Sequence, residues 1–341
     1  MTTRWGFLGT GRIAGVVAGD VSLTEGATAH AVGSRNASRA RAFAEEHGFE
    51  RSYGSYVDLL ADPDVDVVYV ATPHGQHHRD VGACLAAGKP VLVEKSFAVT
   101  AAAARDLVAR ARAARLFCME AMWTRFQPLV VELRRLVADG VIGDIRAIHV
   151  DFGFVSPYDV THRLWNPALG GGALLDVGVY PVSFAQMLLG TPASVSVVGR
   201  LAESKVDSDA ALLLGWPDGA AALLSCSLTS LPSREARIVG SRGRIQLASS
   251  FHRSPALSVY RPDAEPLVVE RPYTGRGYVH ELEEVQRCLA AGLTESPVMP
   301  LDDTLAVIAV LDEAPGALGA VHRDEGWADP GRGHEPGDDV P

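Results

Sequence analysis

FLGTGRIAG, residues 7–15, joins a short apolar strand to the start of a helix through two closely spaced glycines. Gly9, Gly11 and Ala14 have the spacing G-x-G-x-x-A, in which the first glycine permits a tight turn, the second lets a pyrophosphate approach the backbone, and the alanine allows close packing. The amides and positive dipole at the helix start also attract phosphate. Glycines in such a turn can serve backbone geometry alone. The pattern favours a dinucleotide contact made by Gly9, Thr10, Gly11, Arg12 and Ile13.

Short apolar strands alternate with helical segments around this turn. We expect strands at residues 4–9, 27–34, 64–72 and 89–96, and helices at 12–21, 37–48, 76–88 and 100–115. This alternation predicts an α/β Rossmann-type domain over residues 1–121, with a doubly wound parallel sheet and right-handed crossovers.

Beyond residue 122 the pattern changes to strands separated by turn signals such as Pro217-Asp218-Gly219 and Ser241-Arg242-Gly243. This spacing predicts an α+β domain over residues 122–326 with a mostly antiparallel, open sheet. The polar segment 327–341 is rich in Gly and Pro and is expected to be disordered.

Two prolines fall inside segments with helical spacing. Pro181 should kink its helix or lie near the beginning of it, because proline lacks the amide that an interior turn requires. Pro315 should end or kink a closing helix near Ala314.

Composition limits the class of protein. A chain of 341 residues with 47% hydrophobic and 21% charged residues is typical of a globular protein with two domains. The net charge of −10 argues against nucleic acid or an anionic membrane as partner. The four cysteines form no C-x-x-C pair, which argues against a zinc site or a disulfide framework. No basic-then-apolar leader is visible and no apolar run is expected to span a bilayer, so we expect a cytoplasmic protein.

The end of the second strand bears on the choice of cofactor. An acid there would bind the ribose hydroxyls of NAD, but this strand ends in Ser34-Arg35, with Arg39 one turn further on. These residues favour a 2′-phosphate, so NADP(H) is the expected cofactor and NAD(H) remains possible. The alternative is that both arginines are simply solvated on a loop.

PVLVEKSFAV, residues 90–99, is a buried-strand pattern that carries two charges, Glu94 and Lys95. The carboxyl ends of strands in an open α/β sheet form the edge where ligands bind. We therefore expect both side chains to lie at a binding edge, and the alternative is a surface ion pair at a strand end.

Several motifs together resemble the Gfo/Idh/MocA family (glucose–fructose oxidoreductase, inositol dehydrogenase, MocA). ATPHGQHH at 71–78 and GKPVLVEKS at 88–96 are similar to its patterns A-T-P-x-x-x-H and E-K-P. The similarity continues through LFCMEAMWTRFQP, GGALLDVGVYPVSF and ESPVMPLDDTLAVI, which look closest to the dimeric dihydrodiol dehydrogenases, a group that also oxidises aldopyranoses such as D-xylose with NADP.

The resemblance implies roles for individual residues. Lys95 matches the catalytic lysine and Glu94 the acid beside it, while Thr72, Pro73 and His77 match the cofactor-binding A-T-P-x-x-x-H pattern. It also implies a homodimer or a dimer of dimers, because the open sheet of the second domain often forms the interface in this family. We do not expect a metal at His74, His77 and His78, since no acidic partner has suitable spacing nearby.

Ser96 departs from the family pattern, which has proline after the lysine, often through a cis bond. Because a cis bond before a residue other than proline costs about 3 kcal/mol, we expect a trans peptide here, or a strained one.

Asp176 and Tyr180 are four residues apart, so a helix would place both on one face. Tyr180 is the candidate general acid/base, and a nearby Lys95 ammonium would lower its pKa from the free value of about 10. Asp176 would orient substrate hydroxyls and Lys95. The alternative for Tyr180 is a packed aromatic ring with a satisfied hydroxyl.

Matching to the same group suggests Trp123, Arg146 and Phe152 as substrate-lining residues, although core packing explains the aromatic pair equally well. The expected substrate is a small sugar or diol, oxidised at a vicinal diol or sugar hydroxyl with NADP. Two alternatives stay open: reduction of a ketosugar or sugar derivative, and a non-catalytic cofactor-binding sensor or regulator.

Overall fold

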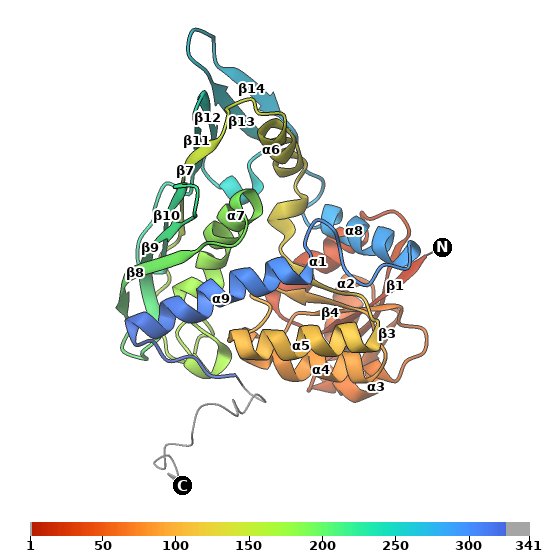
Figure 1. Cartoon of the computed structure of the whole chain (residues 1–341). Coiled ribbons are helices and arrows are strands. Elements are labelled where there is room, and N and C mark those ends of the chain that lie inside the picture. The colour runs from red at the N-terminus through yellow and green to blue at the C-terminus, as the bar shows by residue number, and fades with distance from the viewer. Residues whose placement is uncertain (1, 325–341) are drawn as a thin grey trace.

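The computed structural model describes residues 2–324, which form two sheets with helices packed around them (Figure 1). Residue 1 and residues 325–341 lie outside the described part, and so does the expected disordered tail at 327–341.

The first sheet has six parallel strands in the order β3-β2-β1-β4-β5-β6. The strands are β1 (Thr3–Leu8), β2 (Ala27–Gly33), β3 (Arg51–Tyr53), β4 (Val67–Val70), β5 (Val91–Glu94) and β6 (Cys118–Ala121). The helices between them are α1 (Arg12–Val21), α2 (Ala37–His47), α3 (Tyr56–Leu60), α4 (His77–Ala86) and α5 (Ala101–Ala114). α1 packs beside α2 and α4 beside α5, and the two pairs cover opposite faces of the sheet. The predicted doubly wound parallel sheet is confirmed.

The second sheet has eight strands in the order β14-β13-β12-β11-β7-β10-β9-β8, and every pair is antiparallel except β10 with β7. Its strands are β7 (Ile145–Gly153), β8 (Ser194–Leu201), β9 (Asp207–Gly215), β10 (Ala221–Ser227), β11 (Ala236–Gly240), β12 (Gly243–Leu247), β13 (Ala256–Tyr260) and β14 (Leu267–Glu270). The mostly antiparallel sheet expected from the turn signals is therefore confirmed.

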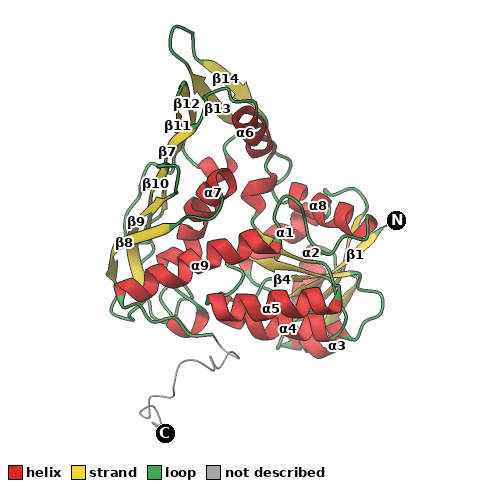
Figure 2. Ribbon diagram, in the orientation of Figure 1, coloured by secondary structure: helices red, strands yellow, loops and turns green. Residues whose placement is uncertain are grey.

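Helices cover one face of this second sheet. They are α6 (Pro128–Ala138), α7 (Val179–Leu189) and α9 (Leu301–Leu318), which lie between the sheet and the first domain (Figure 2). Burial alternates along β9, where Leu212 and Leu214 are buried and Leu213 is 51% exposed. Leu223 of β10 pairs with Leu213 and is 49% exposed, so apolar side chains line up on the face that no described helix covers.

The segment of residues 275–324 also contacts the first domain. Asp20 at the end of α1 accepts backbone hydrogen bonds from Arg276 and Tyr278, just before α8 (Val279–Ala290). The buried guanidinium of Arg125 pairs with Asp303 of α9 at 2.6 Å. The first contact joins the segment before α8 to α1 of the first domain, and the second joins α9 to the short helical turn that follows β6.

The prolines behave differently from one another. Pro181 is the third residue of α7, so the expectation that it lies near a helix beginning is confirmed. A π-helical turn, Leu174–Gly178, leads directly into that helix. Pro315 lies inside α9, which runs on to Leu318, so the helix does not end near Ala314, and the alternative of a kink there stays a prediction. Only about one turn follows Pro315, and the chain leaves the helix at Gly319 with φ +73°.

One apolar run is longer than expected from the sequence. Pro167–Leu189 is long and apolar enough to cross a membrane by length and composition, which corrects the expectation that no such run exists. However, 83% of its most apolar window is buried inside the protein, where it carries the π-helical turn and α7. The core of the second domain therefore accounts for its hydrophobicity.

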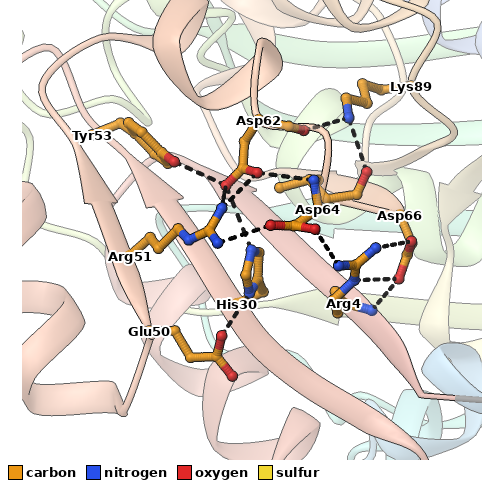
Figure 3. A network of polar contacts seen from close by, with 10 residues as sticks. Arg4, His30, Glu50, Arg51, Tyr53, Asp62, Asp64, Asp66 and Lys89 are labelled. Carbon is orange, nitrogen blue, oxygen red and sulfur yellow. Dashed lines mark hydrogen bonds and ion pairs between the residues drawn. The ribbon is translucent and has the colours of Figure 1, made fainter.

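A polar network closes the amino-terminal edge of the first sheet (Figure 3). Arg51 donates to Asp62 at 2.8 Å and to Asp64 at 2.8 Å, and Arg4 donates to Asp64 at 2.6 Å. His30, Asp62 and Asp64 offer ligand atoms within 4.8 Å of one another. Because the Arg51 guanidinium already bonds both carboxylates, we interpret this cluster as an ion-pair network that joins β1, β2, β3 and the turn before β4.

Candidate active site

A cavity of about 1200 Å³ opens where the carboxyl edge of the first sheet meets the second domain. It is larger than the roughly 300–1,000 Å³ typical of small-molecule sites, and its long lining has room for a dinucleotide beside a small substrate. The predicted residues that line it are Gly9, Thr10, Gly11, Arg12, Ile13, Ser34, Arg35, Arg39, Thr72, Pro73, Glu94, Lys95, Trp123, Phe152, Asp176 and Tyr180.

The turn that contains Gly9 and Gly11 lines one end of the cavity. Gly9 has φ +106°, a conformation that side chains disfavour, and a Cβ there would lie 3.0 Å from the carbonyl oxygen of Ala71. The N-cap residue Gly11 gives no side-chain cap to α1, whose first turn also lacks an acid. The first amides of α1 and its positive dipole are thus left for an anion. These features fit the pyrophosphate of a dinucleotide.

The end of β2 provides a second anion-binding region. Ser34 is buried at the end of the strand, and Arg35 and Arg39 are exposed beside it on the cavity wall. The Asn36 side chain accepts from the amide of Arg39 at 3.1 Å and so caps α2. The cap fixes the turn from which both arginines project, so the residues here suit a phosphate better than a neutral ribose hydroxyl.

His77 is an exception among the predicted cofactor residues. Its ring is fully buried outside the cavity lining, with one nitrogen 2.8 Å from the Thr72 carbonyl oxygen and the other 2.9 Å from that of Ser96. His77 therefore braces the two loops that carry cofactor-side residues, which corrects its assignment as a direct contact. Its fixed place at the start of α4 points the ring inward, beneath those loops.

Lys95 lines the cavity. Its Nζ donates to the backbone carbonyl of Asp176 at 2.8 Å and lies 3.4 Å from Oδ1 of that residue. Arg163 donates to the same Oδ1 at 2.8 Å. Burial acts to raise the pKa of Asp176, but Lys95 and Arg163 outweigh it and hold that pKa below its ordinary value. Asp176 is thus an anion that orients two cations.

The peptide bond between Lys95 and Ser96 is cis, so the expectation of a trans bond is wrong. Tertiary contacts accompany this geometry: the buried Ser96 hydroxyl donates to the Leu175 carbonyl at 2.8 Å, and the Phe97 amide donates to Glu120 Oε1 at 3.0 Å. None of these partners is close in sequence, and for this reason local sequence did not predict the bond.

Tyr180 stands beside Lys95, whose Nζ lies 5.0 Å from the centre of the tyrosine ring. The phenol oxygen accepts a hydrogen bond from Trp123 Nε1 at 3.0 Å. Burial raises the pKa of Tyr180 above its ordinary value. The expectation that Lys95 lowers this pKa is corrected, because the ammonium lies over the face of the ring and burial is the larger influence.

The structure places Arg146 away from this cavity. It lies at the beginning of β7, paired with Asp144 at 3.3 Å and more than half exposed. Phe152 lies six residues further along the same strand, or about 20 Å at the usual rise. Phe152 lines the cavity and Arg146 does not, so the proposed substrate role of Arg146 is not supported in the described chain.

Several residues that line the cavity were not among the predicted site residues, including His74, Arg163, His252 and Tyr278. His74 lies 2.9 Å from the Lys95 carbonyl oxygen and 3.0 Å from that of Gly170, so it supports the lysine loop. His74 belongs to the motif ATPHGQHH, which was the one sequence signal for it. The other three residues come from segments that only tertiary packing brings to the cavity.

Family models match both parts of the chain. Residues 3–122 match the model described as "Oxidoreductase family, NAD-binding Rossmann fold", and residues 130–246 match "GFO/IDH/MocA C-terminal domain". Together the two matches cover most of the described residues, including the glycine turn and the lysine loop.

Curated relatives extend over almost the whole chain. Trans-1,2-dihydrobenzene-1,2-diol dehydrogenase of Mus musculus is 38% identical over 328 residues, covering 94% of this chain and 98% of the relative. The enzyme of the same name from Homo sapiens is 38% identical over 331 residues, with the same coverage.

Solved structures share the two-sheet architecture. A 3-ketoreductase from Actinomadura kijaniata, in complex with TDP-benzene and NADP, has a TM-score of 0.81 at 26% identity and covers 95% of this chain and 99% of its own. An aldose-aldose oxidoreductase from Caulobacter crescentus, complexed with glycerol, has a TM-score of 0.84 at 26% identity, with 92% and 96% covered.

Proposed function

This chain belongs to the GFO/IDH/MocA oxidoreductase family, and on that premise we propose that it transfers hydride between NADP(H) and a vicinal diol or a sugar hydroxyl. One observation carries the proposal: a single cavity joins a phosphate-binding turn at Gly9–Ile13 to the group Lys95, Asp176 and Tyr180. Relatives named as dihydrodiol dehydrogenases and neighbours that act on sugars support this substrate class.

Lys95, Asp176 and Tyr180 have separate roles in the proposed reaction. The bound nicotinamide supplies or accepts the hydride. We assign to Lys95 the role of hydrogen-bond donor to the reacting oxygen, because Asp176 holds its ammonium inside the cavity. We assign the proton to Tyr180. Since Trp123 donates to the phenol oxygen, the phenol hydrogen remains for a substrate oxygen.

The protonated form of Tyr180 is the one that carbonyl reduction requires. A tyrosine whose pKa is raised stays protonated at neutral pH and is a general acid, ready to protonate the oxygen of a carbonyl that receives hydride. This gives a specific reason to keep ketosugar reduction as the second candidate function, in line with the likeness to a 3-ketoreductase.

We propose NADP(H) as the preferred cofactor, because Ser34, Arg35 and Arg39 stand where an acid would select NAD(H). Complexes of a structural neighbour with NADP agree with this choice. NAD(H) can still occupy the same turn, with weaker binding.

We further propose domain limits of 1–121 and 122–326, a cytoplasmic location, and a homodimer or dimer of dimers. The apolar row at Leu213 and Leu223 on the uncovered sheet face supports assembly through that face. Four buried free cysteines agree with a reducing compartment.

An absorbance assay tests the function. NADPH formation or loss is followed with a panel of aldopyranoses, cyclic diols and their keto forms, in both directions. We expect turnover with NADP(H) on at least one member. NADPH binding without turnover on any member would instead support a non-catalytic sensor.

A further inference from the structure

His252 lies among several aromatic rings that line the cavity. It lies in the short helical turn Phe251–Arg253 between β12 and β13, and its ring lines the cavity. Its ring centre lies 4.5 Å from that of Phe152, 5.5 Å from that of Trp123 and 5.6 Å from that of Tyr180. The second domain thus places an imidazole against the ring of the candidate acid.

The imidazole is buried without a hydrogen-bond partner for Nδ1 among the described residues. Only 9% of the residue is exposed. A phenylalanine would fill this aromatic corner without an unpaired polar atom, and burying such an atom destabilises a protein. Nδ1 is out of reach of a ligand, whereas Nε2 is not among the buried unpaired atoms and has no hydrogen-bond partner among the described residues, so Nε2 is the nitrogen open to the cavity. A polar ring retained at this cost indicates that a ligand bonds Nε2.

The charge state of His252 narrows the ligand class. Burial lowers its pKa to about 3, and the neighbouring cations Arg253, Arg234 and Lys95 add to this effect. The ring is therefore neutral, with one nitrogen that donates and one that accepts. A hydroxyl group, which also donates and accepts, is its natural partner, whereas a carboxylate or phosphate would find no charge on the ring.

His252 and Lys95 both contact the ring of Tyr180. Lys95 Nζ lies 5.0 Å from the ring centre, and the His252 ring lies 5.6 Å from it. Lys95 is also near enough to help lower the pKa of His252, and both residues line the same cavity. A pyranose carries hydroxyls around its ring, but a cyclohexadiene diol carries them on one edge only and presents C–H groups elsewhere.

We infer that His252 is a substrate-binding residue that hydrogen-bonds a hydroxyl remote from the reacting carbon, and that it makes the site selective for polyhydroxylated rings over arene-derived diols. This inference rests on the proposed function and narrows its substrate class. A site that contains a polar group discriminates against a substrate that leaves the group unpaired.

The test compares wild type, His252→Phe and His252→Gln on two substrates: the best aldopyranose of the panel and trans-1,2-dihydrobenzene-1,2-diol. Phenylalanine keeps the ring but removes both polar atoms, whereas glutamine keeps a donor and an acceptor. We expect His252→Phe to lower kcat/KM for the sugar by about tenfold or more, mainly through KM, as loss of one hydrogen bond predicts. The diol should change by less than about twofold, and His252→Gln should recover part of the sugar activity.

Two controls separate this role from a structural one. His252→Phe should bind NADPH with unchanged Kd, and its Tm should equal or exceed that of the wild type, because an unpaired buried polar atom is gone. Sugar kinetics that do not change, a wild type that uses the diol but no sugar, or an equal loss on both substrates would overturn the inference alone. Absence of turnover in the wild type with every substrate would overturn the proposed function, and this inference with it.

Discussion

Replacing Tyr180 with phenylalanine removes one oxygen and leaves the ring that packs against Phe152 at 5.1 Å and against His252 at 5.6 Å. If Tyr180 moves the proton, turnover falls by about 10²–10⁴-fold, the usual contribution of a positioned acid or base. The loss should appear in kcat as well as in kcat/KM, because the proton is transferred only in the transition state.

The same change has a measurable cost in stability. Trp123 Nε1, whose residue is 5% exposed, loses the acceptor that it meets at 3.0 Å. An unpaired buried donor costs about 1–3 kcal/mol, and the low end applies because this ring borders a cavity that water can enter. The free energy of unfolding should therefore fall by about 1 kcal/mol, too little to explain a hundredfold loss of turnover.

Steady-state rates of Tyr180→Phe, measured with the best panel substrate across neutral pH in both directions, decide the assignment. Tyr278→Phe is the matched control, since Tyr278 is another tyrosine of the same cavity, stacked on Trp123 at 4.7 Å. It should lose far less activity. In the reducing direction the wild-type rate should show no titration of Tyr180 near neutral pH, because burial raises its pKa. A Tyr180→Phe enzyme with near-normal turnover would refute the reasoning and move the proton to Lys95 or a water chain.

Three further results are expected. NADPH should bind wild type at least about tenfold tighter than NADH, a difference of about 1.4 kcal/mol, and Arg35→Ala should erase most of this preference in fluorescence titrations; equal Kd values in wild type would contradict it. Burial raises the pKa of Glu120 to about 7, so the folded state holds a proton that the unfolded chain releases near pH 4.5, and stability should fall as pH rises from about 4.5 to 7. Glu120→Gln, which keeps an acceptor for the Phe97 amide, should flatten that trend in Tm against pH, and an unchanged slope would count against the buried acid. Light scattering should give a dimer or tetramer at micromolar concentration, and Leu213→Asp should shift it toward monomer; a wild-type monomer would rule out assembly through the uncovered sheet face.

Local sequence was enough to predict the first domain. Gly9, Gly11 and Ala14 have a spacing whose physical reasons are all short-range: a positive φ, an open helix start and close packing. The buried strands that follow have the continuous apolar character of parallel strands covered on both faces. The approach of Lys95 to Asp176 and Tyr180 across about 80 residues came instead from family resemblance, because spacing in the chain gives no distance in space.

Several features that the sequence did not predict depend on contacts between residues far apart in the chain. The inward role of His77 depends on the Ser96 carbonyl, 19 residues further along the chain. His252 was missed for the same reason, since it follows a strand of the second sheet and reaches the site only through the packing of Phe251 against Phe152 and Phe184. The pKa of Tyr180 was misjudged because burial, which sequence does not give, outweighed the neighbouring charge.

Transfer of a labelled hydrogen tests the central claim most directly. The best sugar or diol of the panel is prepared with deuterium at the reacting carbinol carbon and incubated with the enzyme and NADP⁺, and the cofactor is then analysed by mass spectrometry. We expect the reduced cofactor to carry the substrate's deuterium in wild type, and its formation to fall by about 10²–10⁴-fold in Tyr180→Phe. Reduced cofactor without the label would contradict hydride transfer in the cavity that Lys95, Asp176 and Tyr180 share, and equal labelling rates in the two proteins would contradict the role of Tyr180.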